Sequence, residues 1–357
     1  MGVVEDQMTD VDPQQSNDFT SGNMLEGIKV IDMTSVVFGP YSSQTLADLG
    51  AEVIKVESPG GDAFRYSATP SKTQGMSPGY MALNRGKSSI VLNLKDPEDL
   101  ASMKALLADA DVFIHNVRGQ AVEKLGLGYE AVKALQPEII YAHCVGFDQS
   151  GPYADLQAYD DVIQAASGAA TLLPRVDGNP RPRYFPSLIA DKVAGLHGVY
   201  AVLAAIIHRL RSGKGQFVEV PMFEAFTHFM MLEHLGGQTF SPPNGSVGYA
   251  RQLDPDRQPF PTRDGHVSIV VYTIQSVATI FELLEAPNFL EEHGYTDPVQ
   301  LFKDSDKMYQ GISDLTQNFT CDEILERFRK AQIPVQRVND LAEVKDDPQL
   351  QAVGLFE

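Results

Sequence analysis

The sequence predicts an α/β protein with a large domain built on a parallel sheet, followed by a smaller α/β domain. Between Leu25 and Gly146, short apolar runs alternate with helical patterns, which is typical of parallel βαβ units. Residues 236–264 are then rich in Pro, Gly and Asn and are predicted to be a linker before a second set of strands and helices. The 357 residues, 43 % of them hydrophobic, suffice to build two such cores.

The large domain is expected over residues 25–235. Its predicted strands cover residues 28–33, 52–56, 89–94, 112–115, 139–145 and 217–221. Helices are predicted over 40–49 and 96–108, each with Pro in its first turn, then in a block that begins at residue 160, and over 222–235. This order makes the domain Rossmann-like.

The smaller domain is expected over residues 265–338. It combines strands over 266–271 and 335–338 with helices over 273–284 and 320–331. Residues 339–357, with short helices over 340–346 and 348–352, are expected to return toward the large domain. Residues 1–24 contain five acidic residues and no Lys or Arg, so we expect a disordered tail there.

Charge and composition exclude several classes of function. The net charge of −19 argues against nucleic acid or an anionic membrane as a partner. No run of about 20 residues is both apolar and uncharged, so no membrane span is expected, and no signal peptide is recognisable. Cys144 and Cys321 have neither metal nor redox spacing, and the histidines form no metal pattern. We therefore expect a cytoplasmic protein with no metal site.

The turn after the first strand, Thr34–Pro40, contains one glycine where a dinucleotide site would have three. A hydride-transfer enzyme is therefore not expected.

Asp191 is the single carboxylate at the start of a long apolar helix that carries no charge from Val193 to Ile207. An Asp in this position often serves only as a cap or a partner of the helix dipole. It can also serve as a covalent nucleophile. With the ordinary pKa of about 3.9 it would be ionised near neutral pH and would need no base.

Four segments, in this order and spacing, resemble the class III coenzyme A transferases of the CaiB/BaiF type. This family includes formyl-CoA transferase and carnitine CoA-transferase. The segments are Gly27–Asp62, Asn84–Ile90, Asn116–Gly126, and Tyr159–Ala170 followed by Asp191–Ala225.

The resemblance implies that Asp191 is the nucleophile of a CoA-transferase. It would form a mixed anhydride and then an aspartyl-CoA thioester, with an acyl-CoA and a carboxylic acid as substrates and no cofactor besides CoA itself. It also implies an interlocked homodimer. Members of the family continue beyond a point like Glu357, so this chain is expected either to be truncated or to end differently.

The CoA site needs cations for its phosphates and an apolar slot for its pantetheine arm. The resemblance places nucleotide binding on Asn116, Val117, Arg118, Ala121 and Lys124. Arg85 and Lys87 precede one predicted strand, and Arg118 and Lys124 follow another. Because strand ends converge at one edge of an α/β sheet, all four cations are expected to line one crevice. The alternative is that they are solvated surface residues.

Tyr159 stands where the related 2-methylacyl-CoA racemases have a histidine. With a pKa near 10, Tyr is poorly suited to proton exchange, so it is expected to hydrogen-bond the substrate, or else to be a half-buried tyrosine at a helix start. Val37 and Phe38 are apolar where formyl-CoA transferases have a polar and a small residue, which favours acids larger than formate or oxalate. A racemase and a non-catalytic CoA-binding protein are the alternative functions.

Overall fold

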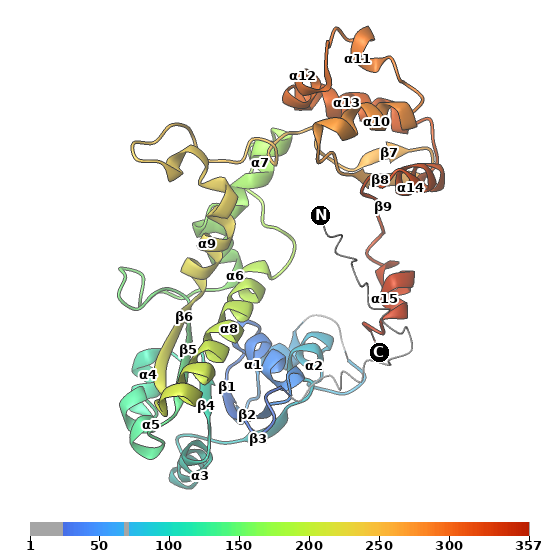
Figure 1. Cartoon of the computed structure of the whole chain (residues 1–357). Coiled ribbons are helices and arrows are strands. Elements are labelled where there is room, and N and C mark those ends of the chain that lie inside the picture. Colours follow the sequence, from blue (N-terminus) through green and yellow to red (C-terminus); the bar gives the residue numbers. More distant parts are fainter. Residues whose placement is uncertain (1–23, 68–70, 357) are drawn as a thin grey trace, which may run out of the picture. The chain divides into compact units, whose positions relative to one another are not determined.

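The computed structural model describes residues 24–67 and 71–356 and divides them into two compact units (Figure 1). One unit contains the described residues up to Ala170 together with Tyr184–Met231. The other contains Thr171–Arg183 and the described residues from Leu232 onward. The acidic tail predicted over residues 1–24 lies outside the described residues, apart from Met24.

The first unit is built on a six-stranded sheet in the order β3-β2-β1-β4-β5-β6, with every neighbouring pair parallel. This confirms the predicted α/β fold. The strands are β1 (Lys29–Met33), β2 (Glu52–Glu57), β3 (Ser88–Val91), β4 (Val112–His115), β5 (Ile140–Val145) and β6 (Gln216–Pro221). The order reverses between β1 and β4. In open α/β sheets, the carboxyl ends of the strands at such a reversal border the binding crevice.

Helices cover both faces of this sheet because alternate strand residues are apolar on each face. On β4, Val112 and Ile114 belong to the hydrophobic cluster that also contains residues of α1 (Phe38–Asp48), α8 (Ile189–Ser212) and α9 (Met222–His234). Phe113 points to the other cluster, with residues of α3 (Pro97–Ala108), α4 (Gly119–Lys124) and α5 (Tyr129–Leu135). The buried strands β4 and β5 are apolar along nearly their whole length, as expected for a sheet covered on both faces.

Helix α8 is the longest in the described chain, and it is long and apolar enough to cross a membrane by length and composition alone. About 44 % of its apolar window is buried, where the helix packs on α1, β5 and β6. Such a helix is also what the core of a water-soluble domain contains. The shorter elements of this unit are η1 (Ala63–Tyr66), α2 (Pro78–Asn84), α6 (Asp160–Ala166) and η2 (Ala169–Thr171, which ends at the first residue of the other unit).

The second unit has a small antiparallel sheet in the order β7-β8-β9, formed by β7 (Phe260–Thr262), β8 (Gly265–Ile269) and β9 (Val335–Arg337). Strand β7 lies inside the segment predicted to be a linker. The helices are α7 (Leu172–Asp177), η3 (Gly236–Thr239), α10 (Ile274–Leu283), α11 (Phe289–Glu292), α12 (Pro298–Lys303), α13 (Ser305–Thr316), α14 (Cys321–Lys330), η4 (Val344–Asp346) and α15 (Pro348–Ala352).

Candidate active site

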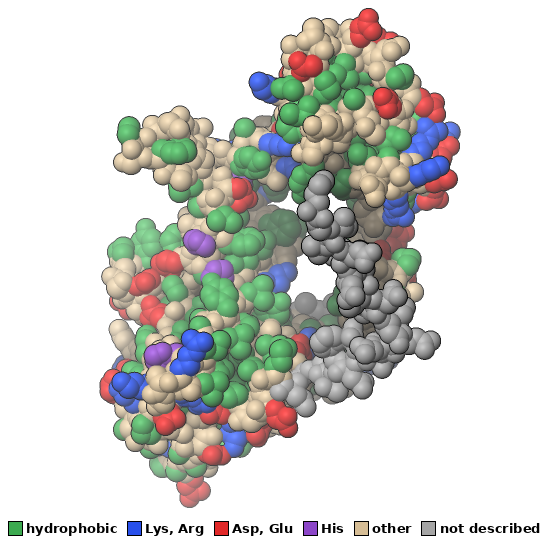
Figure 2. All heavy atoms as spheres, in the orientation of Figure 1, with side chains coloured by type: hydrophobic (Ala, Val, Ile, Leu, Met, Phe, Trp, Pro, Cys, Tyr) green, Lys and Arg blue, Asp and Glu red, His purple; other side chains and the backbone are tan. Residues whose placement is uncertain are grey.

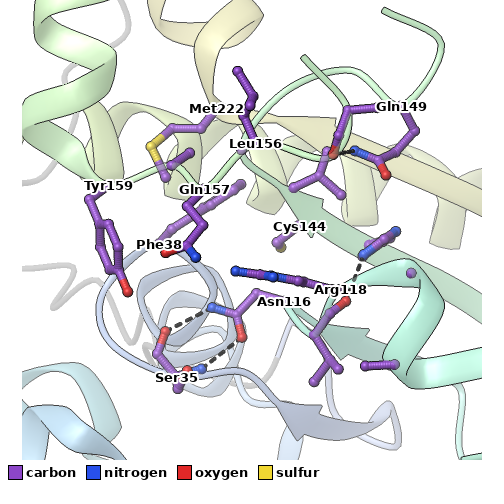
Figure 3. Close-up of a pocket in the computed structure, with 18 of the residues that line it drawn as sticks. Ser35, Phe38, Asn116, Arg118, Cys144, Gln149, Leu156, Gln157, Tyr159 and Met222 are labelled. Carbon is purple, nitrogen blue, oxygen red and sulfur yellow. Dashed lines mark hydrogen bonds between the residues drawn. The ribbon is translucent and has the colours of Figure 1, made fainter. Parts of the chain in front are cut away.

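A cavity of ≈ 690 Å³ opens in the first unit at the carboxyl ends of β1, β4 and β5 (Figure 3). Its walls are residues 35–38 and 116–121, which follow β1 and β4, residues 143–146 at the end of β5, and residues 154–159. Lys124, Gln149, Asp191 from the first turn of α8 and Met222 from the start of α9 complete the lining. The cavity therefore lies where the strand order reverses, the usual place for a ligand in this architecture.

Asp191 is held in place by the way α8 begins. Leu188, at the cap position of α8, offers no side-chain hydrogen bond. Asp160 of α6 supplies the missing acceptor, since its Oδ1 accepts hydrogen bonds from the backbone N–H groups of Ala190 (2.7 Å) and Asp191 (3.1 Å). Its Oδ2 accepts from Gln164 Nε2 at 2.6 Å. The first turn of α8 is thus fixed by a buried carboxylate from another helix.

The side chain of Asp191 is mostly buried, and its pKa is raised to about 7. Burial is the main cause, and the negative charge of Asp160 adds to it. The nearby backbone N–H of Phe38 partly offsets both effects. The expectation of an ordinary pKa is therefore wrong: near neutral pH a substantial fraction of Asp191 is protonated.

Arg118 and Lys124, the two cations expected from the resemblance after β4, both line the cavity. Both residues are exposed, and neither forms an ion pair with a described residue. Val117 and Ala121 line the same wall. The guanidinium group of Arg118 suits two-pronged contact with a phosphate, and the ammonium of Lys124 suits a point contact.

Asn116 also lines the cavity, but its side chain is occupied by the protein itself. Its Oδ1 accepts from the backbone N–H of Ser35 at 3.0 Å, and its Nδ2 donates to the Ser35 carbonyl at 2.9 Å (Figure 3). Asn116 therefore joins the segment after β4 to the segment after β1 and shapes the cavity wall between them.

Arg85 and Lys87 do not line the cavity, so the expectation that four cations share one crevice is wrong for these two. The side chain of Lys87 is 1 % exposed, and its Nζ lies 3.0 Å from Oδ2 of Asp32. Burial lowers the pKa of Lys87, and the charge of Asp32 opposes that shift. Arg85 is exposed and pairs with Asp48 at 2.5 Å. Asp32 and Asp48 lie far from these cations in the sequence. The spacing of nearby residues therefore could not predict where either cation lies.

Tyr159, Val37 and Phe38 all line the cavity as predicted from the sequence. Tyr159 occupies the cap position of α6 and is 63 % exposed, so it is more open than a half-buried tyrosine at a helix start. Val37 and Phe38 are only 3 % and 4 % exposed, and Phe38 belongs to the hydrophobic core. Their side chains therefore show little apolar surface to a ligand.

Sequence reasoning missed the residues that hold the site together. Asp160 follows Tyr159 directly, but paired acids in a first turn are also ordinary partners of a helix dipole. The carboxylate of Asp62 accepts from the backbone N–H of Val36. Asp62 follows Gly60 and Gly61, and nothing in its neighbouring sequence indicates this contact. His143 and Cys144 belong to β5 and reach the cavity only because that strand ends there.

Comparisons with known proteins agree with this arrangement. The model of CoA-transferase family III matches residues 25–357. A succinate–glutarate CoA-transferase of Agrobacterium fabrum is 33 % identical over 93 % of this chain and 84 % of its own length. A succinyl-CoA:glutarate CoA-transferase of Homo sapiens is 30 % identical over 95 % of this chain and 77 % of its own length. A crystal structure of a CaiB/BaiF family protein from Brucella suis is similar with a TM-score of 0.80 and 29 % identity, over 94 % of this chain and 88 % of that one.

Proposed function

The chain belongs to CoA-transferase family III, and we propose that it transfers CoA from an acyl-CoA to a carboxylic acid through covalent intermediates on Asp191. The observation that carries the proposal is the cavity itself. The buried carboxylate of Asp191 lines the same cavity as two exposed cations, Arg118 and Lys124, which have no ion-pair partner among the described residues. The cations suit the phosphates of CoA, and the carboxylate suits attack on its thioester.

The proposed reaction needs no external acid or base. A carboxylate oxygen of Asp191 attacks the thioester carbon, the C–S bond breaks, and an anhydride and the CoA thiolate form. The thiolate then attacks the carbonyl carbon of Asp191, which releases the donor acid and leaves an aspartyl-CoA thioester. The acceptor carboxylate attacks this thioester, and the expelled thiolate takes the acceptor acyl group and frees Asp191. A carboxylate is a weak nucleophile, so positioning must supply effective molarities of about 10⁵ M or more.

For the substrates we propose acids of four or five carbons rather than formate or oxalate. Two similar relatives are named for succinate or succinyl-CoA with glutarate. Val37 and Phe38 line the cavity but are only 3 % and 4 % exposed, so the proposed size of the acids rests on these relatives.

We further propose that the protein works as a homodimer. Helix α8 exposes Leu196, Tyr200, Ile207 and Leu210, which share one helix face and are each about half exposed or more. Figure 2 shows hydrophobic side chains gathered on the face where α8 lies. A second copy of the chain would cover them. A cytoplasmic location stays a prediction from the sequence.

The decisive experiment compares the wild type with Asp191→Ala. Each protein is incubated with succinyl-CoA and glutarate, transfer is followed by chromatography of the acyl-CoAs, and adducts are sought by mass spectrometry. We expect a CoA adduct on Asp191 in the wild type, and no transfer in the variant despite intact folding and CoA binding. Transfer above a few per cent in the variant would rule out covalent catalysis through Asp191. Loss of α-deuterium from an acyl-CoA in D₂O would instead support a racemase.

A further inference from the structure

The backbone between β1 and α1 is held almost entirely by side chains. Residues 34–36 have left the strand and have not yet entered the helix, so neither ladder satisfies their N–H and C=O groups. Four buried or half-buried side chains do so instead. At Thr34, Asp32 accepts from the N–H (2.9 Å) and Lys55 Nζ donates to the C=O (2.9 Å). Asn116 bonds both backbone groups of Ser35 (3.0 and 2.9 Å), and Asp62 accepts from the N–H of Val36 (3.1 Å).

Val36 has a φ of +73°, in the left-handed region that a β-branched residue rarely adopts. Such a conformation persists only where the surroundings hold it in place. The N–H of Val36 donates to the carboxylate of Asp62. Asp62 is 3 % exposed, and its carboxylate lies 3.1 Å from Nζ of Lys55. The backbone N–H of Asp62 donates to Oε2 of Glu57 at 2.9 Å, so the aspartate is itself anchored to β2.

The strained Val36 lies two residues before a backbone N–H that is close to Asp191. Two residues later, Phe38 opens α1, where the N–H groups of the first turn have no partner within the helix. Phe38 and Asp191 line the same cavity, and the N–H of Phe38 lies close enough to the carboxyl group of Asp191 to lower its pKa. A backbone rotation at Val36 would therefore move this donor relative to Asp191.

We propose that Asp62 is a positioning residue for CoA transfer: it keeps Val36 in the left-handed conformation and thereby keeps the Phe38 N–H on the carboxyl group of Asp191. The inference rests on the proposed function. Asp62 does not line the cavity, so it acts through the backbone and not on the substrate. Two of the four covalent steps form a tetrahedral centre at the carboxyl carbon of Asp191, and there the N–H would stabilise the developing oxyanion.

Asp62→Asn tests this role, and Asp111→Asn is its matched control. The Lys55 ammonium should attract the single amide oxygen of the substituted side chain, so that the NH₂ group faces the N–H of Val36 and cannot accept from it. Asp111 also accepts a backbone N–H, from Lys29 at 2.7 Å, and also pairs with a cation, Arg209 at 2.7 Å. It lies at the opposite, amino-terminal end of β1 and β4. Because loss of one oxyanion donor costs about 10²- to 10³-fold in kcat, a displaced donor should cost about 10- to 100-fold.

The expected pattern separates positioning from general stability. In Asp62→Asn, kcat should fall about 10- to 100-fold while the Kd for CoA stays within about twofold, and Asp111→Asn should keep kcat within about twofold. Adding Val36→Gly to Asp62→Asn should restore most of kcat, because glycine adopts the left-handed conformation without strain. A kcat for Asp62→Asn equal to that of Asp111→Asn, or no rescue by Val36→Gly, would overturn the proposal.

Titration of Asp191, followed by ¹³C NMR, provides a readout that does not depend on transfer. Moving the Phe38 N–H away from the carboxyl group should shift the titration midpoint of Asp191 upward in Asp62→Asn, and the midpoint should stay in place in Asp111→Asn. An unchanged midpoint contradicts the positioning role even if the wild type transfers nothing, an outcome that would refute the proposed function separately. The other ionisable groups around Asp191 stay the same in both variants: Arg118, Lys124, His143, Asp155, Tyr159 and Asp160.

If Asp62→Asn does not fold, Asp62→Glu takes its place. Glutamate keeps the negative charge beside Lys55, but its side chain is longer by one methylene group, so the carboxylate no longer lies where it accepts from the N–H of Val36. Wild-type kcat in that variant would overturn the proposal, and a lowered kcat that Val36→Gly restores would support it.

Discussion

Asp191 faces two opposing demands, because a nucleophile must be ionised whereas burial beside Asp160 keeps its pKa near 7. The protein therefore has only part of its nucleophile in the reactive form near neutral pH. The same burial removes water from the carboxylate, which strengthens its interactions with a bound thioester.

The first prediction concerns pH. Attack requires the carboxylate, so kcat/KM should rise about tenfold per pH unit below a midpoint near 7 and level off above it. In Asp160→Asn the amide oxygen can still cap α8 but the repelling charge is gone, so the midpoint should move to lower pH. A profile that is flat between about pH 5.5 and 8 would contradict this assignment.

The second prediction concerns stability. The pKa of Asp191 is raised on folding, so between about pH 4 and 7 the folded state binds more protons than the unfolded state. Stability should fall as pH rises through that window. Asp191→Asn removes this effect and should be more stable than the wild type by about 2–4 kcal/mol at about pH 8, with the gain vanishing near pH 4. Urea unfolding at both pH values measures it, and a gain that does not change with pH would show that the raised pKa of Asp191 is not its cause.

The third prediction compares Arg118 and Arg85, which the sequence predicts to line the same crevice. Arg118→Ala should weaken CoA binding by about 1.5–3 kcal/mol, the range for hydrogen bonds to charged groups. Arg85→Ala should leave it unchanged, since Arg85 pairs with Asp48 away from the cavity. Calorimetry with free CoA measures both, and equal losses would place the phosphates elsewhere.

At this scale, sequence predicted best those residues whose role follows from their own position. Asp191, Arg118 and Lys124 reach the cavity because each lies close to the start or the end of a helix. Lys87 could not be placed in this way, because its partner Asp32 lies 55 residues earlier and both are buried. Such pairings depend on the assembled sheet.

At the scale of elements, the site depends on how closely α1 and α8 approach. A methyl group at Gly195 of α8 would lie 2.8 Å from Cδ1 of Tyr41 and 3.1 Å from the carbonyl oxygen of Phe38. Ser42 Oγ donates to the carbonyl of Gly195 at 2.8 Å, which ties the two helices together. The glycine therefore sets the spacing between the helix that carries Phe38 and the helix that carries Asp191.

The fourth prediction follows from this spacing. In an open helix, Gly→Ala is stabilising by about 1 kcal/mol. Gly195→Ala should instead destabilise the protein by about 1–3 kcal/mol through overpacking and should lower kcat about tenfold by shifting Asp191. Thermal unfolding and kinetics measure both effects, with Ala204→Ser on the exposed face of α8 as the control. A stabilised and fully active Gly195→Ala variant would show that the contact has no role.

The sequence predicted the long, regular elements well and the short ones poorly. Helix α3 begins directly after Asp96, whose side chain caps it, as the Asp-Pro start indicates. Helix α1 begins at Phe38 and not at Pro40, because proline fits anywhere in a first turn, where its missing N–H is not needed. Strand β7 has three residues and acquires its identity from pairing with β8, which the Pro- and Gly-rich composition around it conceals.

At the scale of the whole molecule, the family predicted from four motifs is confirmed, and so is the α/β fold. Residues 171–183 are grouped with the second unit although they lie within the stretch that builds the first. Local composition cannot indicate such a grouping, since it depends on contacts between segments far apart in sequence.

The last prediction concerns assembly. Leu210, near the end of α8, is 73 % exposed, and Ile207, Tyr200 and Leu196 continue the apolar face toward Asp191. Burying apolar surface contributes about 25 cal/mol per Å² to the free energy of association, so we expect a second chain to bury these side chains. Light scattering should give twice the chain mass for the wild type. Leu210→Glu should lower the dimer fraction, whereas Lys214→Glu, exposed just beyond the same helix, should not. A wild type that is monomeric at tens of micromolar would instead mean that the face of α8 stays open to solvent, and that one chain alone must then supply every residue of the site.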